Sequence, residues 1–233
     1  MSSRVLLLSG AGRYSDPWHP FPQTSARVAE VLRDAGLDVT VSDDVDGALA
    51  RLGDDAPDLL VLNIGAADGP LAPGVEETPP DRARDAATRD GLLAHLASGR
   101  PLLALHVSST SLGFVPEWES ILGGIWVRGT TMHPDYDRAR IHVETGAHPI
   151  VAGIGDFDTD DERYSWMRVD PAVQALAWQE HDGAHHPLLW THAFGAAPVV
   201  YDALGHDAAS YDSAESREFV ARSALWLLGQ LEA

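Results

Sequence analysis

Three polar residues, Asn63, His106 and His206, each stand where an apolar, strand-like run of the chain breaks off. The carboxyl ends of parallel strands meet at one edge of an open α/β sheet. We therefore expect these three residues at one edge, with the loop that carries Trp18 and His19 beside them. A histidine exchanges protons near neutral pH or binds a metal through one ring nitrogen. This placement indicates a site for acid–base or metal chemistry.

His106 lies among small residues, in the order Ala104-Leu105-His106-Val107-Ser108. A residue at the tip of a sharp strand-to-helix turn is often strained, and small neighbours prevent a clash there. Histidine tolerates the left-handed region better than most side chains, so we expect a positive φ at His106. The chain has no cysteine, which excludes thiol nucleophiles and thiolate metal sites. Ser108 lacks a Gly-x-Ser-x-Gly frame, and this disfavours a serine hydrolase.

The elements that must position these residues alternate between strand and helix through the first half of the chain. Right-handed crossovers then give a parallel sheet with helices on both faces, and shorter alternating segments after residue 140 predict extra edge strands. The sequence thus predicts an α/β three-layer sandwich with a mostly parallel central sheet, in a single domain over residues 1–233. Strands are expected at 4–9, 39–41, 58–63, 102–105 and 198–204, and helices at 24–35, 46–52, 81–98, 116–122 and 213–231.

Charge and hydropathy exclude several classes of partner. Sixteen basic and 35 acidic residues give a net charge of −19, which repels phosphate backbones and anionic lipids. No apolar stretch reaches membrane-spanning length, and the apolar run from Val5 to Leu8 is too short for a secretion signal. We expect a cytoplasmic protein with a small-molecule ligand and with neither nucleic acid nor membrane as partner. A homo-oligomer remains open.

Several short motifs follow one another along the chain in an order that is typical of one protein family. They are Trp18-His19, the turn 104–108, Trp118 with residues 122–124, His133-Pro134, His148-Pro149, Asp161-Glu162-x-Tyr164, Pro187-x-x-Trp190 and residues 204–207. In this order the chain resembles the trehalose-utilisation (ThuA-like) family of the class I glutamine amidotransferase-like superfamily. The resemblance implies a flavodoxin-like fold and a carbohydrate-related activity on a sugar-like ligand.

The resemblance has two departures. Glutamine amidotransferases carry cysteine in a Gly-x-Cys-x-Gly elbow, where this chain has His106, so glutamine hydrolysis is not expected. The family's flanking glycines and its basic Gly-Lys-Gly-Arg turn are replaced by Ala104, Ser108 and residues 195–198.

Proton transfer is expected from His106, His206 and Glu162. Glu162 ends the acidic run 158–162, which by itself indicates a solvated turn, and only the resemblance distinguishes it from its neighbours. Asp207 either orients His206 as a general base or caps the last loop. Aromatic faces beside carboxylates and histidines are typical of sugar sites, whereas Trp190 is expected in the core. The candidate substrate-binding residues are Trp18, His19, Asn63, Ser108, Trp118, His133, Tyr164 and Asp207.

Three functional classes follow from these residues. The first is an enzyme that acts on a disaccharide or oxidised sugar derivative through histidine and glutamate proton transfer, as an isomerase or hydrolase would. The second is a sugar-binding or regulatory domain that has lost its nucleophile. The third is a hydrolase with a divalent metal held by His106, His133, His206 and Glu162. No short His-x-x-x-His spacing supports the metal, so it depends on residues far apart in the sequence.

Overall fold

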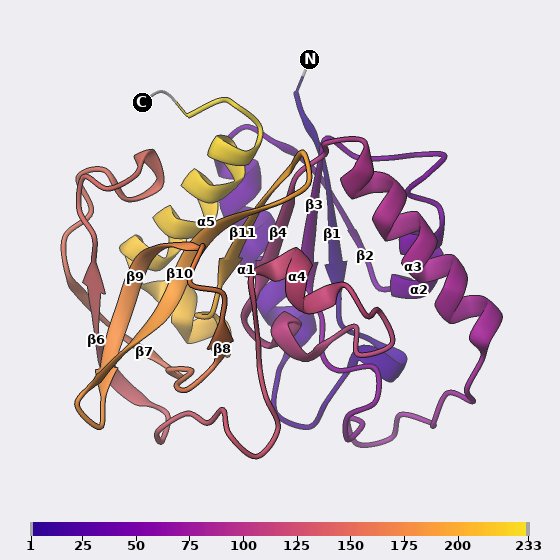
Figure 1. The fold of residues 1–233 in the computed structure, drawn as a ribbon, viewed down its shortest axis with the longest axis horizontal. Coiled ribbons are helices and arrows are strands. Elements are labelled where there is room, and N and C mark those ends of the chain that lie inside the picture. Colours follow the sequence, from indigo (N-terminus) through magenta and orange to yellow (C-terminus); the bar gives the residue numbers. More distant parts are fainter. Residues whose placement is uncertain (1, 232–233) are drawn as a thin grey trace.

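A nine-stranded mixed sheet forms the centre of the protein, which a computed structural model describes over residues 2–231 (Figure 1). One half is parallel in the order β2-β1-β3-β4-β11, the strand order of flavodoxin-like folds. The other half continues as β10-β9-β6-β7 and is antiparallel, and β5 and β8 form a separate pair. The strands are β1 (Arg4–Ser9), β2 (Asp38–Ser42), β3 (Leu59–Asn63), β4 (Leu102–Leu105), β5 (Gly124–Ile125), β6 (Asp137–Val143), β7 (Phe157–Asp161), β8 (Arg168–Val169), β9 (Gln174–His181), β10 (Ala184–Phe194) and β11 (Ala197–Asp202).

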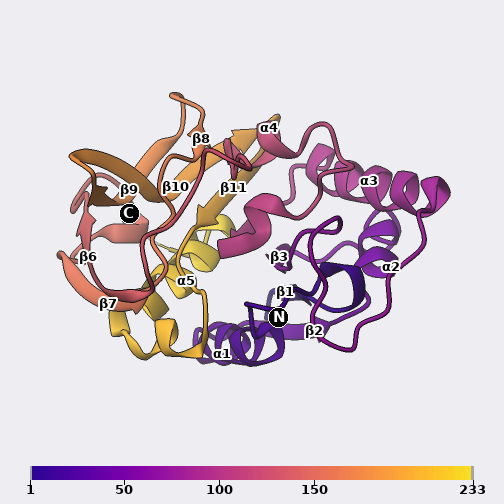
Figure 2. The ribbon, with the colours of Figure 1, turned by 90° about the horizontal axis from the view of Figure 1, so that it is seen from below.

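Helices cover both faces of this sheet, so the expected three-layer α/β fold is confirmed. Helices α1 and α5 lie together on one face, and α2, α3 and α4 lie on the other (Figure 2). The α-helices are α1 (Phe21–Asp34), α2 (Val45–Ala50), α3 (Arg82–Ala97), α4 (Trp118–Leu122) and α5 (Ala214–Leu227), and the 3₁₀ helices are η1 (Gly12–Tyr14), η2 (His106–Thr110), η3 (Pro149–Val151) and η4 (Ala208–Asp212).

The central strands are buried on both faces, as their unbroken apolar sequences require. Every residue of β4 and the first four residues of β3 are fully buried. The antiparallel half is more extensive than the short edge strands expected, because β9 and β10 pair along most of their length. Pro187 inside β10 is accommodated next to a register shift in this pairing.

Helix α1 begins at Phe21, three residues before the expected cap at Thr24. Pro22 fits the first turn of a helix, where its missing N–H costs nothing. Thr24 is buried inside the helix, and its hydroxyl accepts a hydrogen bond from the Asn63 side chain (2.8 Å). The helix therefore reaches closer to the site than the sequence indicates.

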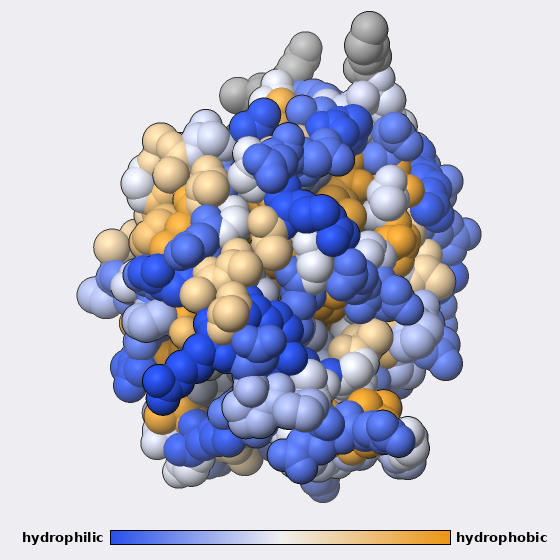
Figure 3. Space-filling view, turned by 90° about the vertical axis from the view of Figure 1, so that its right-hand side faces the viewer, coloured by the Kyte–Doolittle hydropathy of each residue, from blue (hydrophilic) through white to orange (hydrophobic). Residues whose placement is uncertain are grey.

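The surface next to α2 and α3 is mostly hydrophilic, with only scattered apolar spots, in keeping with the acidic composition (Figure 3). Between residues 2 and 231, no helix is both long and apolar enough to cross a membrane.

The expected backbone strain at the end of β4 is confirmed, since His106 has φ = 43°. The buried Tyr201 hydroxyl donates to the carbonyl oxygen of His106 (2.6 Å), and the Ser108 hydroxyl donates to the carbonyl oxygen of Leu62 (2.9 Å). A non-glycine residue in this region costs about 1–3 kcal/mol and persists only where its surroundings hold it. The two hydrogen bonds provide that restraint.

A second constraint lies at the end of β11, where the Asp202 side chain is buried. Burial raises the pKa of Asp202 to about 8, although its carboxylate accepts a hydrogen bond from the Leu204 N–H (3.0 Å), which acts in the opposite direction. The folded protein thus holds a proton on this carboxyl group that the unfolded chain releases near pH 4.

Substitutions at His106 test the strained turn. We expect His106→Val to be about 1–3 kcal/mol less stable to urea than His106→Asn, because asparagine tolerates positive φ and a β-branched residue does not. Both variants remove the imidazole, so the difference between their unfolding free energies reports the backbone strain at residue 106. Equal unfolding free energies would show that the turn relaxes without cost.

Asp202→Asn tests the buried proton. A folded-state pKa above the unfolded value makes the parent lose stability as pH rises from about 4 to 8. The amide keeps an acceptor for Leu204 and has no proton to lose. Its stability relative to the parent should therefore increase by about 2 kcal/mol or more between pH 5 and 8.5. Urea unfolding at both pH values measures this change, and a pH-independent difference would contradict it.

Candidate functional site

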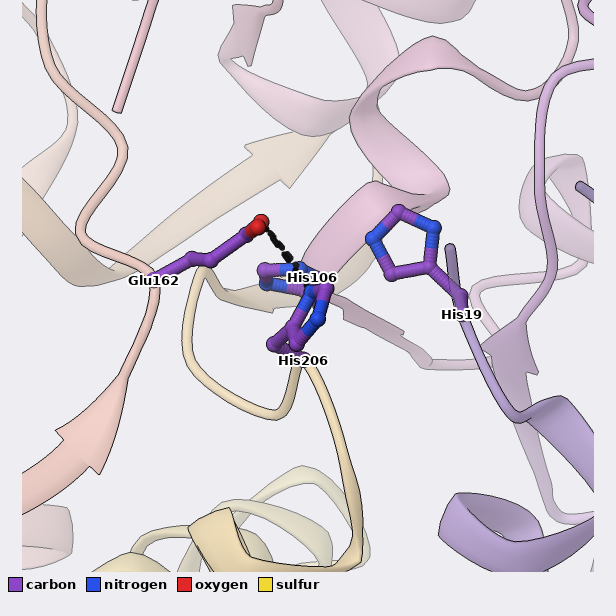
Figure 4. A group of neighbouring side chains, drawn as sticks. All are labelled: His19, His106, Glu162 and His206. Carbon is purple, nitrogen blue, oxygen red and sulfur yellow. Dashed lines mark ion pairs between the residues drawn. The ribbon is translucent and has the colours of Figure 1, made fainter. Parts of the chain in front are cut away.

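Four side chains meet at the carboxyl edge of the parallel strands: His19, His106, Glu162 and His206 (Figure 4). Each offers one nitrogen or oxygen atom within 4.8 Å of the others. The ring centroids of His106 and His206 are 5.6 Å apart, and His19 lies 5.0 and 4.9 Å from them. The expectation that His106, His206 and the His19 loop share one edge is confirmed.

Asp161, the last residue of β7, positions two of these groups. Its fully buried carboxylate accepts hydrogen bonds from the backbone N–H of Glu162 (2.8 Å), Gly205 (2.8 Å) and His206 (3.1 Å). Burial raises the pKa of Asp161 to about 6, although these backbone donors act in the opposite direction. The acidic run expected to be a solvated turn is thus a strand with Asp161 facing inward.

His106 is held in one tautomer. Its Nδ1–H donates to the carbonyl oxygen of Ala203 (2.7 Å), so Nε2 carries the lone pair. The Tyr164 hydroxyl donates to this Nε2 (2.9 Å), and Glu162 Oε2 lies 3.6 Å away. Burial lowers the pKa of His106 to about 4, and the opposing effect of Glu162 is smaller. His106 is therefore a neutral acceptor at neutral pH.

His19 is oriented by Asp16. The His19 Nδ1–H donates to the Asp16 carboxylate (2.7 Å), which also accepts from the backbone N–H of Trp18 and of His19 (both 2.9 Å). Burial would raise the pKa of Asp16, but the hydrogen bonds with His19 outweigh it and lower the pKa. The other ring nitrogen of His19, Nε2, is buried and finds no hydrogen-bond partner among residues 2–231.

Glu162 lies between histidines. Its Oε2 is 3.1 Å from His206 Nδ1, and its Oε1 is 3.4 Å from His133 Nε2. Burial alone would raise the pKa of Glu162, but His106 and His206 outweigh it and hold the pKa well below its usual range. Burial would lower the pKa of His206, yet Glu162 raises it overall. Glu162 is thus held as a carboxylate.

A cavity of about 420 Å³ opens beside this cluster. Trp18, which is 60% exposed, lines this cavity together with Trp126 and Tyr164. The rings of Trp126 and Tyr164 pack edge to face, with their centroids 4.7 Å apart. His133 and Glu162 also line it, so aromatic faces and polar groups converge on a volume suited to a small sugar.

The sequence reasoning missed two contributors to this site. Trp126 lines the cavity and lies seven residues before His133, and its aromatic side chain was the signal that could have identified it. The spacing Asp16-x-x-His19 was the signal for the carboxylate that orients His19.

Three expected ligand-binding residues do not reach the cavity. The Trp118 side chain is buried, and its Nε1–H donates to the carbonyl oxygen of Ser108 (3.0 Å). Asn63 is buried, and its side-chain amide donates to the hydroxyls of Thr24 and Ser25. The buried Ser108 hydroxyl donates to the carbonyl oxygen of Leu62. The expectation of an aromatic platform at Trp118 is wrong, because this side chain supports the turn from behind.

Asp207 follows the second of its two expected roles. Its carboxylate caps η4 by accepting from the backbone N–H of Ala209 (2.8 Å) and Ser210 (3.3 Å), and it also accepts from the Tyr136 hydroxyl (3.3 Å). Trp190 is buried in the core, as expected.

Comparisons with known proteins agree with this architecture. A ThuA-like protein from Parabacteroides merdae has a TM-score of 0.77 at 18% identity, over 100% of this chain and 92% of that chain. A second ThuA-like protein, from Bacteroides uniformis, has a TM-score of 0.71 at 13% identity, over 97% and 91% of the two chains. A glutamine amidotransferase from Thermotoga maritima gives 0.52 at 12% identity over both full lengths. No curated protein matches the sequence.

At these identities the solved structures show a shared fold and nothing of the chemistry. The family model named ThuA and described as trehalose utilisation, however, matches residues 4–227, nearly the whole chain. The turn at His106, His206 and Glu162 all lie inside that match. The chain belongs to the ThuA family.

Proposed function

We propose that the protein is an enzyme that acts on a disaccharide or an oxidised sugar derivative by proton transfer, as an isomerase or a hydrolase. The convergence of the Glu162 carboxylate and its surrounding histidines on a sugar-sized cavity carries this proposal. The family description, trehalose utilisation, supports the substrate class.

The aromatic side chains would bind the substrate. Sugar C–H faces pack against aromatic rings while the hydroxyls form hydrogen bonds with polar neighbours. Trp18 is the most exposed large apolar side chain of this cavity, and Trp126 lines the same space. A pyranose ring bound against Trp18 would lie within reach of Glu162 and His133, because all three line one cavity.

Proton transfer would occur where the cavity meets the buried cluster. His133 is the most exposed histidine in contact with Glu162, with 36% of its side chain accessible. Its Nδ1–H donates to the carbonyl oxygen of Pro134 (2.8 Å), which leaves Nε2 directed toward Glu162 Oε1. In this arrangement His133 and Glu162 exchange protons with the substrate, and His106 and His206 position the carboxylate from behind.

Replacing the carboxylate tests catalysis. We expect Glu162→Gln to lower turnover by roughly 10²-fold or more with a smaller loss of affinity, because glutamine keeps the shape and a hydrogen-bonding oxygen. Glu144→Gln is the control, since Glu144 binds Trp178 Nε1 at the surface. Calorimetry and turnover assays on trehalose, other disaccharides and their oxidised derivatives provide the measurement. If several of these sugars bind to the parent and none reacts, the sugar-binding alternative becomes the better account.

Removing the exposed ring tests the sugar platform. Trp18→Ala should weaken binding of a panel sugar by roughly tenfold, the scale of one lost apolar or aromatic contact, while turnover at saturation stays within a few-fold. Trp178→Ala, which changes a tryptophan stacked on His142 outside this cavity, is the matched control. A turnover loss with unchanged affinity for Trp18→Ala would contradict the platform.

A further inference from the structure

We infer that His19, His106, Glu162 and His206 bind a divalent first-row transition metal ion. The metal site lies in the candidate active site. The binding of the ion does not depend on the proposed function, whereas a catalytic use of the ion rests on it. Its starting observation is that four ligand atoms from four separate segments lie within 4.8 Å of one another (Figure 4).

The spacing approaches that of a coordination sphere. Ligand atoms at about 2.0–2.2 Å from a cation lie about 3.3–3.6 Å apart in a tetrahedral site and up to about 4.4 Å apart when they are opposite each other, so the widest pair must close by roughly 0.4–1.5 Å. His19 and Glu162 lie outside the helices and strands, in segments that can shift toward the ion. The Tyr164 hydroxyl, which now donates to His106 Nε2, would turn away and release that lone pair.

The partners of the histidines already match those of metal ligands. A metal-binding histidine usually donates its other ring N–H to a carboxylate or a backbone carbonyl, which fixes its tautomer. His19 does so to Asp16, and His106 does so to Ala203, so that both Nε2 atoms carry lone pairs. These two hydrogen bonds come from different parts of the chain, and each leaves on Nε2 of its histidine the lone pair that would bind a cation.

One ring nitrogen in the cluster lacks any other use. His19 Nε2 is buried and has no hydrogen-bond partner among the described residues 2–231, whereas His206 Nδ1 lies 3.1 Å from Glu162 Oε2. The His19 side chain is only 10% accessible, so water does not readily satisfy it. An unpaired buried polar atom is costly, and a cation bound between His206 Nδ1 and Glu162 Oε2 would also satisfy His19 Nε2.

The donor types select the class of ion. Three imidazoles and one carboxylate suit Mn²⁺, Fe²⁺, Co²⁺, Ni²⁺ or Zn²⁺, whereas Mg²⁺ and Ca²⁺ prefer oxygen ligands. His19 takes the place that the sequence reasoning gave to His133, whose Nε2 approaches only Glu162 Oε1 in this cluster. Because His19 and Glu162 also line the cavity, a bound ion would be open to a substrate hydroxyl or carbonyl.

Metal binding is measured on the full chain after chelator treatment, by titration with Co²⁺ and Zn²⁺ and by elemental analysis. The parent should bind about one equivalent, with the visible absorption of nitrogen-coordinated Co²⁺. His19→Gln and His206→Gln should each weaken Co²⁺ binding by about 100-fold. Asp16→Asn should weaken it by about 10–100-fold, the usual effect of losing the group that orients a ligand.

His142→Gln is the matched control, because this histidine pairs with Asp156 and lies outside the ligand set; it should bind Co²⁺ within about threefold of the parent. Circular dichroism and thermal melting of the metal-free variants establish that each is folded. Less than about a tenth of an equivalent in the parent, for every ion from Mn²⁺ to Zn²⁺, would overturn the inference. Equal affinity in parent, His19→Gln and His206→Gln would also overturn it.

The two proposals fail separately. Parent-like turnover of a panel sugar by metal-free protein would leave the enzyme and refute the catalytic use of the ion, while the Co²⁺ titration alone decides whether the site binds metal. One tightly bound equivalent with no reacting sugar would refute the enzyme and leave the metal site.

Discussion

The geometry of the site depends on one buried carboxylate, that of Asp161. It ends β7, which lies four strands from β11 in the sheet, yet it accepts N–H groups from the loop that follows β11. The antiparallel half curls back to make this contact (Figure 2). The same carboxylate also binds the N–H of Glu162, so a single anion fixes the backbone that presents Glu162 and the backbone that presents His206. The hydrogen bond between Tyr164 and His106 joins the two halves of the sheet at the same place.

Unfavourable local features are concentrated around this point. His106 has a positive φ, His19 Nε2 lacks a hydrogen-bond partner among residues 2–231, and two buried aspartates have raised pKa values. Each feature costs stability, and fully buried apolar strands on both sides supply the compensation. Backbone strain and buried charges that share one edge of a sheet are typical of a site kept for its chemistry.

Patterns local to one strand were sufficient to predict half of the site. The break from apolar to polar residues located His106 and His206 at one edge, and the small neighbours of His106 predicted its positive φ. Contacts between distant segments could not be predicted in this way. Nothing in the acidic run distinguishes Asp161 as the residue that faces inward. Nothing near Trp118 reveals that its ring is buried and that its Nε1–H donates to the carbonyl oxygen of Ser108. Aromatic type alone does not separate a ligand platform from a core side chain; the three-dimensional direction of the side chain decides, as the contrast between Trp18 and Trp118 shows.

The histidine at the elbow has one further consequence, which concerns oxidation. A cysteine at such a turn is open to peroxide and to alkylating reagents, and its oxidation ends activity. This chain has no sulfur at the elbow and no thiol anywhere, so neither kind of reagent has a cysteine target. Any cysteine introduced by mutation would be the sole thiol of the molecule. A fluorescent or spin label could thus be attached at one chosen position beside the cavity without prior removal of native cysteines.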